Sequence, residues 1–303
     1  MRRRRPARHR NRAIEVGIKY GGHGITMRPS RALSSLVAAI RRVYGAFAPY
    51  ATEGDAWNDL REGLRKWGPE IACRTEDEAR RRSHVSELNT FAFDVLLTSG
   101  DVEELKQLLP QLLEFLALER TALICHEVIG DRLRLAEWHT WPDEERAAVQ
   151  GFFDAWWVWV LDTFPASGDQ WAPGIGDGFR AEISTSVCTL ANAFQDLRPF
   201  LGRWEKRRSV SSLRQLADFV LDNQNALLKE GQFRVRLANA FYEEREEQME
   251  QVVRWLVREE IVQKFEAASF RYSRSPFAGE AAPTPLGEPW CTTGASCRLI
   301  RSR

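Results

Sequence analysis

Apolar residues recur every three or four positions through most of this chain of 303 residues, and sustained alternation is almost absent. Such spacing places apolar side chains on one face of an α-helix, whereas a half-buried strand needs a period of two. The first clear run follows Ser30 and contains Leu33, Leu36, Ile40 and Val43. The sequence therefore predicts an all-α protein, a helical solenoid or an irregular bundle of about nine to eleven helices.

Local signals predict where several helices begin and end. Ser30 stands where an N-cap residue is expected, and Gly100 stands where a helix would stop. Pro142, followed by three acidic residues, is typical of the first position of a helix. Pro110 interrupts a leucine-rich run, so we expect a kink or a break there. The last helical region is expected to span about 238–270 and to be strongly charged on its outer side.

One segment is similar to a known repeat. The sequence LKQLLPQLLEFL at 105–116 resembles the first helix of a HEAT repeat, which is leucine-rich and carries a proline. The sequence DLRPFLGRW at 196–204 is a weaker second example. Pro110 and Pro199 lie 89 residues apart, which fits two helix pairs of about 40–47 residues each. The resemblance implies a HEAT-like α-solenoid with a concave binding surface, and the irregular helical bundle stays the alternative.

Charge divides the chain into three parts. Residues 1–30 carry a net charge of +8, residues 271–303 carry +3, and the body at 31–270 carries −10. We expect 1–30 to be a basic leader that is disordered or not part of the native protein, because a clean helical start follows Met27. The tail at 271–303 is expected to be disordered. An acidic body is a poor surface for phosphates, so nucleic acid is an unlikely partner.

Cysteine usage and hydropathy indicate the compartment. The five cysteines are odd in number and match no zinc spacing, and Cys125 and Cys188 lie on apolar helical stretches typical of buried thiols. No apolar run approaches the length of a membrane span. We therefore expect a cytoplasmic protein that does not enter a membrane. Arginine outnumbers lysine 37 to 6, a bias typical of GC-rich bacterial coding.

The densest cluster of potential ligands contains His126, Glu127, Asp131 and His139. Glu127 and Asp131 are four residues apart, so they share a helix face on which they could hold a divalent cation. The pattern of a zinc protease is incomplete, because Gly130 occupies the position of its second histidine. Charges on a solvated helix surface are the favoured interpretation, and a metal site formed by Glu127, Asp131 and His139 is the alternative.

Other acidic and glycine-rich patterns give weaker signals. Asp218 and Asp222 share a helix face, and Asp154 and Asp162 lie among aromatic residues on the polar side of their helix. Each pair is interpreted as an ordinary polar surface. The glycines of GIGDG at 174–178 lack the preceding strand and the following lysine of a phosphate loop. No catalytic or cofactor-binding residue is assigned from these patterns, and no cofactor is expected.

Eleven tryptophans are the most unusual feature of the composition. Tryptophan at helical spacing is usually part of a core, and tryptophan on a surface is enriched at binding hot spots. Trp159 falls off the apolar stripe of its helix, and Trp171 lies in a segment rich in glycine and proline. These two residues are the candidates for contact with a partner.

The sequence favours a non-catalytic, cytoplasmic helical module that binds another protein, and the acidic body favours a partner with a basic surface. The alternative is a helical-bundle enzyme or small-molecule binder, with Glu127, Asp131 and His139 around a metal. The partner, substrate and oligomeric state are not predicted.

Overall fold

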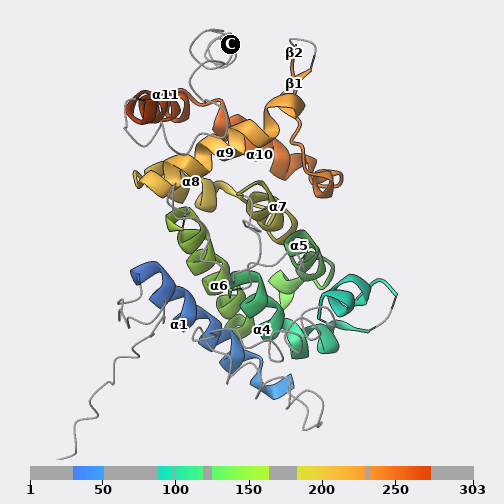
Figure 1. Ribbon diagram of the computed structural model, residues 1–303. Helices are drawn as coiled ribbons and strands as arrows, with labels where there is room; N and C mark the ends of the chain where they lie inside the picture. The colour runs from blue at the N-terminus through green and yellow to red at the C-terminus, as the bar shows by residue number, and fades with distance from the viewer. Residues whose placement is uncertain are drawn as a thin grey trace, which may run out of the picture.

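The computed structural model describes residues 30–50, 88–98, 100–118, 125–163, 183–229 and 232–273, and these ranges are mostly helical (Figure 1). The all-α prediction is confirmed. The α-helices with assigned bounds are α1 (Arg31–Ala46), α4 (Val102–Leu118), α5 (His126–Leu135), α6 (Asp143–Asp162), α7 (Ile183–Ala193), α8 (Arg198–Lys206), α9 (Val210–Leu227), α10 (Glu246–Leu256) and α11 (Glu259–Ser273). Three short 3-10 turns are η1 (Ala48–Tyr50), η2 (Trp138–Thr140) and η3 (Ala240–Tyr242). A small antiparallel pair joins β1 (Leu228–Lys229) to β2 (Gln232–Phe233), and its strands are too short to show periodicity in the sequence.

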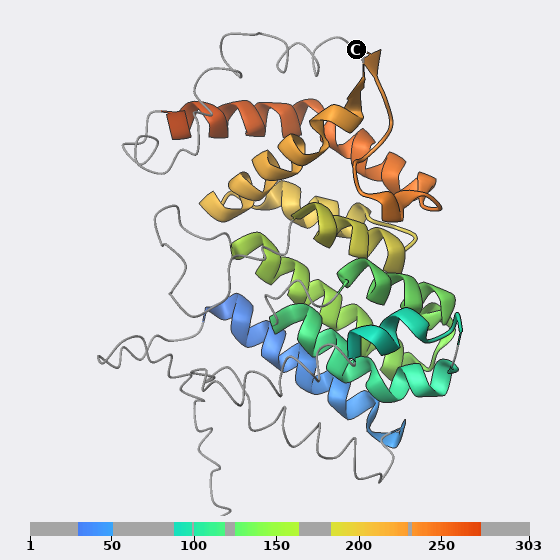
Figure 2. The ribbon, with the colours of Figure 1, turned by 45° about the vertical axis from the view of Figure 1, so that its right-hand side comes forward.

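The helices are stacked in layers that follow the order of the chain. Helix α1 packs against α4 and α6, α5 packs against α7, and α9 packs against both α7 and α11. Figure 2 shows α1 at one end of the stack and α11 at the other. The two views agree that α5 and α7 lie in the middle of the stack.

Helix α1 forms where its sequence signals predict. The Ser30 Oγ accepts a hydrogen bond from the Leu33 amide at 3.1 Å, which satisfies one of the free N–H groups of the first turn. Leu36, Ile40 and Val43 are buried on one face, and this face packs mainly against α6. The predicted N-cap and the predicted apolar stripe are both confirmed.

Helix α6 lies in the centre of the stack and is buried on more than one side. Phe153, Trp156 and Val160 lie on the predicted apolar face and are buried. Trp157, on a second side, is also buried, and its indole N–H donates to the Phe200 carbonyl at 2.9 Å. The buried surface of α6 is thus wider than one stripe because α7, α8 and α9 pack on it as well as α1.

Aromatic rings link successive layers into one continuous core. The ring centroids of Phe153 and Phe194 lie 5.2 Å apart, and those of Trp157 and Trp204 lie 5.4 Å apart. Trp204 stacks on Trp255 of α10 at 5.0 Å with an angle of 28° between the planes. Edge-to-face and stacked pairs of this kind add stability beyond the burial of their area. Most of the tryptophan content of the described residues therefore serves the core.

Pro110 does not break its helix. Helix α4 continues from Val102 to Leu118 with Pro110 inside, so the break considered from the sequence does not occur. Leu109 and Leu112, on either side of the proline, are fully buried. Burial of the leucine-rich face holds the helix together at a position where one backbone hydrogen bond is missing.

The helical region expected over 238–270 consists of several elements. The structure divides this region into η3, α10 and α11, and α10 ends at Leu256 with Val257 as its C-cap. The apolar spacing continues across the break, with Trp255 and Ile261 both buried. Periodicity alone could not reveal the boundary, because it depends on the side of the stack that each helix covers.

Several sequence predictions fall outside the described residues. These are the basic leader and almost all of the predicted tail, the loop at 165–178, and the cysteines Cys73, Cys291 and Cys297. Of the helices in the described ranges, none has both the length and the apolar character needed to cross a membrane.

Candidate functional site

Helices α5 and α7 approach each other very closely at Gly130. A Cβ atom built at Gly130 would lie 2.4 Å from the backbone oxygen of Thr189 and 3.1 Å from Cβ of Asn192. Contacts this short are not tolerated between heavy atoms, so only glycine fits. The residue that replaces the second histidine of the protease pattern therefore has a packing role.

Glu127 is buried and bonded, and does not lie on a solvated helix surface. Its side chain accepts a hydrogen bond from Asn239 Nδ2 at 2.7 Å, and the Cys125 thiol donates to the other carboxylate oxygen at 3.5 Å. The residue is 7% exposed. Burial, together with the nearby Glu127 carboxylate, raises the pKa of Cys125 to about 11. This thiol therefore stays protonated at neutral pH and is a weak nucleophile.

The two cysteines of the described segments differ in exposure. Cys188 is fully buried in α7, as the sequence predicts, whereas Cys125 is only partly buried. Both are free thiols. Burial raises the pKa of Cys188 as well, so neither thiol is activated.

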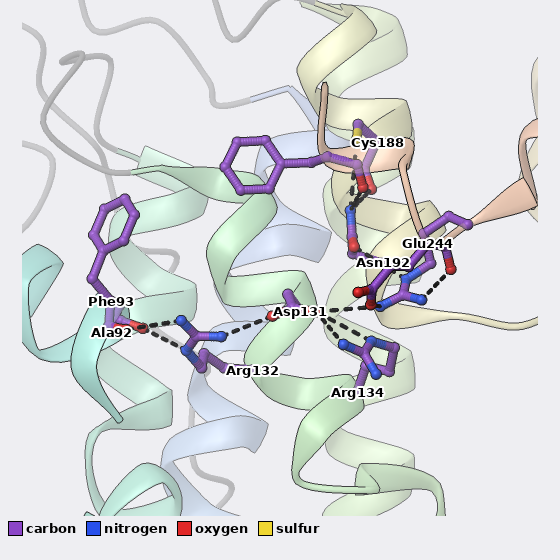
Figure 3. A network of polar contacts seen from close by, with 10 residues as sticks. Ala92, Phe93, Asp131, Arg132, Arg134, Cys188, Asn192 and Glu244 are labelled. Carbon is purple, nitrogen blue, oxygen red and sulfur yellow. Dashed lines mark hydrogen bonds and ion pairs between the residues drawn. The ribbon is translucent and has the colours of Figure 1, made fainter. Parts of the chain in front are cut away.

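Asp131 accepts hydrogen bonds from three arginines. Arg132 Nη1 donates to Oδ2 at 2.7 Å, and Arg134 Nη2 donates to Oδ1 at 2.6 Å. Arg245 Nη2, which arrives from the chain just before α10, lies 3.3 Å from the same Oδ1. Figure 3 shows Asp131 between Arg132 on one side and Arg134 on the other. We call these four residues the Asp131 network.

The Asp131 network ties α5 to three other segments. Arg132 also donates to the backbone oxygens of Ala92 and Phe93, both at 2.8 Å, and so holds the end of the helical turn at 88–94. Arg245 Nε donates to Asn192 Oδ1 on α7 at 3.3 Å. The carboxylate that the sequence offered as a metal ligand is thus saturated by cationic donors of the protein itself.

The two histidines near α5 lie in different environments. His126 is 1% exposed, its ring packs edge-on against Trp156, and neither ring nitrogen has a hydrogen-bond partner. Burial lowers the pKa of His126 to about 4. His139 lies on the surface in η2.

The proposed metal-ligand set is therefore not assembled. Among the residues that the structure describes, no group of three or more His, Cys, Asp and Glu side chains could hold a metal ion. Glu127 is bonded to Asn239, Asp131 is bonded to arginines, and His139 is exposed. The central carboxylate of the set, Asp131, is already paired with arginines in the structure.

The other acidic candidates lie on polar surfaces. Asp154 is bonded to Arg203 and Gln150, and Asp162 is bonded to Arg207. The polar-stripe interpretation of Asp154 and Asp162 agrees with these contacts. In the second pair, Asp222 accepts a hydrogen bond from Ser184 at 2.9 Å, and Asp218 is partly buried. The glycine-rich segment at 174–178 lies outside the described residues.

Of the two tryptophan candidates, only one can be placed. Trp159 is partly buried and packs against the hydrophobic core, so it is not a free surface residue. Trp171 lies in the range that the structure does not describe.

A groove of about 590 Å³ opens beside the Asp131 network. It lies where α5 and α7 end and α10 begins, next to η2. Its apolar lining consists of Trp138, Ala191, Ala193 and Phe194. Arg134, His139, Asn192, Gln195, Arg245 and Gln248 contribute polar groups to it.

Four glutamates complete the lining, and we call them the acidic rim: Glu243, Glu244, Glu246 and Glu247. All four are exposed. Within the described part of the chain, Glu244 Oε2 lies 3.8 Å from Arg245 Nη2, and the other three glutamates form no ion pair. With Arg134 and Arg245 counted, the formal charge of the groove lining is −2.

The acidic run EEREE at 243–247 belongs to the helical region expected over 238–270, whose charges are predicted to lie on its outer side. In the structure this run precedes and begins α10, so its glutamates gather on one edge of the groove. Only the break before α10, which the periodicity does not show, brings them beside α5 and α7.

Comparisons of the chain with models of protein families, with curated proteins and with solved structures found no significant match. The geometry of the groove and the chemistry of its lining are therefore the basis for a functional proposal. Both concern charge and shape, and neither depends on a relative.

Proposed function

We propose that this chain is a non-catalytic helical module of the cytoplasm that binds a basic segment of another protein. The binding site is the groove between the ends of α5 and α7 and the start of α10. The observation that carries the proposal is the acidic rim, four exposed glutamates that line a groove together with apolar and polar side chains.

The helix ends beside the groove also favour a positively charged partner. The C-termini of α5 and α7 both face the groove, and the C-terminus of a helix carries a partial negative charge. The start of α10 carries the opposite partial charge, but Glu246 and Glu247 occupy its first turn. A lysine or arginine side chain that enters the groove meets negative potential from the rim and from two helix ends.

The internal pairing of other charges supports binding over catalysis. Glu127 and Asp131 are each bonded within the protein, and burial keeps the thiols protonated. A catalytic acid, base or nucleophile needs access to a substrate. The rim glutamates, in contrast, lie open to solvent, where they can form ion pairs with a partner.

The net charge of the whole body would speed its association with a basic partner. The body at 31–270 carries −10, so a basic partner is attracted before contact, and this attraction weakens as salt rises. The layered order of the helices also fits the predicted HEAT-like α-solenoid, in which neighbouring helices present one extended surface (Figure 2).

Fluorescence anisotropy with a labelled lysine-rich peptide tests the proposal. Changing all four rim glutamates to glutamine should weaken binding by about tenfold or more, because each exposed ion pair contributes a fraction of a kcal/mol. Binding to the unchanged protein should also weaken as sodium chloride is added.

A matched control carries four glutamines in the first turns of α4 and α11, at Glu103, Glu104, Glu259 and Glu260. These residues are exposed and, like Glu246 and Glu247 of the rim, lie in the first turn of a helix, but they do not line the groove. The control variant should bind the peptide nearly as well as the unchanged protein. Equal losses in the two variants, or no binding by the unchanged protein, would contradict the proposal.

A further inference from the structure

Asp131 pairs with two arginines that line the groove. Arg134 and Arg245 both line the groove, and both reach the same oxygen of Asp131, at 2.6 and 3.3 Å. The side chain of Arg134 is 35% exposed, so it can turn toward a bound partner, whereas that of Arg245 is 11% exposed. Asp131 itself does not line the groove.

We infer that Asp131 is a positioning residue that strengthens the preference of the groove for positively charged segments. It does so by holding and neutralising Arg134 and Arg245. This inference rests on the proposed function and adds the residue that makes the groove selective for basic segments.

The third arginine of the network has a separate task. Arg132 is 4% exposed at its side chain, and it is also held by the backbone oxygens of Ala92 and Phe93. It therefore stays in place when Asp131 changes. The freed arginines would be Arg134 and Arg245, which face the groove.

Arg245 also connects Asp131 to the acidic rim. It lies in sequence between Glu244 and Glu246, and it donates both to Asn192 Oδ1 and to the Glu244 carbonyl. Asp131 thus fixes the backbone from which the rim glutamates project. If Asp131 loses its charge, the rim keeps its glutamates, but Arg134 and Arg245 lose the carboxylate that they share.

The test compares two labelled peptides of equal length, one rich in lysine and the other with glutamate at the same positions. The Asp131→Asn variant should bind the lysine peptide several-fold more weakly and the glutamate peptide more tightly. The ratio of the two affinities should shift by about tenfold, as expected for a few exposed ion pairs. A purely structural role would weaken both peptides alike and leave the ratio unchanged.

A second substitution separates charge from structure. Adding Arg134→Gln to Asp131→Asn should restore most of the preference for lysine, because the main freed cation is removed. Asp154→Asn is the control, since Asp154 pairs with Arg203 on α8 and lies outside the groove. It should leave the ratio of affinities unchanged.

Each outcome decides the inference. If the unchanged protein binds neither peptide, the proposed function fails and the inference fails with it. If it binds the lysine peptide and Asp131→Asn keeps the same ratio, only the inference is overturned. If Asp131→Asn does not fold, Arg134→Gln alone decides: it should bind the lysine peptide about threefold more tightly, and an unchanged affinity overturns the inference.

Discussion

Two neighbouring residues of α5 show opposite solutions to the burial of a polar side chain. Glu127 is buried with hydrogen bonds from Asn239 and Cys125, and so keeps the partners that a charged group requires. His126 is buried against Trp156 with neither nitrogen bonded. A neutral imidazole tolerates this environment at a cost, whereas a protonated one does not. His126 should therefore make the fold sensitive to acid.

Burial lowers the pKa of His126 from 6.5 to about 4, so the unfolded chain binds a proton that the folded chain rejects. Stability contributed by this residue is complete above the unfolded value and is lost as the pH falls toward 4. Between pH 7 and pH 5 the free energy of unfolding should fall by about 2 kcal/mol through His126 alone. Urea unfolding at the two pH values measures this difference.

The His126→Phe variant should lose that part of the pH dependence, because phenylalanine fills a similar space beside Trp156 and does not titrate. His139→Gln is the control, since His139 is exposed. It should unfold with the same pH dependence as the unchanged protein. An identical acid sensitivity in His126→Phe would show that His126 is not the buried titrating group.

At the scale of elements, the contact between α5 and α7 positions the groove. It depends on Gly130, which lets the two helices approach without a side chain between them. The groove lies where both helices end, so their spacing sets the distance between its walls. A change that separates α5 from α7 should therefore affect both stability and binding.

Gly130→Ala would place a methyl group 2.4 Å from the Thr189 oxygen, which belongs to the backbone and cannot turn away. We expect the free energy of unfolding to fall by about 2 kcal/mol, although alanine is the better helix former. Chemical unfolding followed by circular dichroism gives the value.

The Gly202→Ala substitution should raise the free energy of unfolding, whereas Gly130→Ala should lower it. Gly202 lies within α8, and a Cβ atom built there has no neighbour within 4 Å. The same substitution should therefore stabilise the protein by about 1 kcal/mol, through helix propensity alone. Equal effects at the two glycines would contradict the close approach of α5 and α7.

At the scale of the whole molecule, aromatic contacts join the layers into a single core. The ring of Trp204 in α8 contacts the ring of Trp157 in α6 and also that of Trp255 in α10. The buried hydrophobic residues of these helices belong to one core cluster, so each helix depends on its neighbours to cover its apolar face. The described helices should therefore lose their structure together.

We expect urea unfolding curves from far-ultraviolet circular dichroism and from tryptophan fluorescence to coincide. The first reports helices throughout the stack, and the second reports indoles in several layers, among them Trp141, Trp157 and Trp255. Coincidence of independent probes is a test of cooperative unfolding. Two separate transitions would show that the stack contains independent units.

The sequence predicts the fold class well because helical periodicity is local. The Ser30 cap, the α6 stripe and the leucine face of α4 can all be read from neighbouring residues. The groove could not be predicted, since it depends on the break before α10 and on contacts between α5 and residues more than one hundred positions away. The sequence suggests Asp131 as a metal ligand for the same reason. A single sequence does not show that the Arg245 side chain lies within hydrogen-bonding distance of the Asp131 carboxylate.

The separation of these partners along the chain has a consequence for synthesis. Glu127 bonds Asn239 112 residues later, and Asp131 bonds Arg245 114 residues later. While the ribosome is still adding α7 to α9, both carboxylates of the nascent α5 lack these late contacts. The elongating polypeptide therefore stays incompletely assembled around α5 until residues 239–245 have emerged from the ribosome.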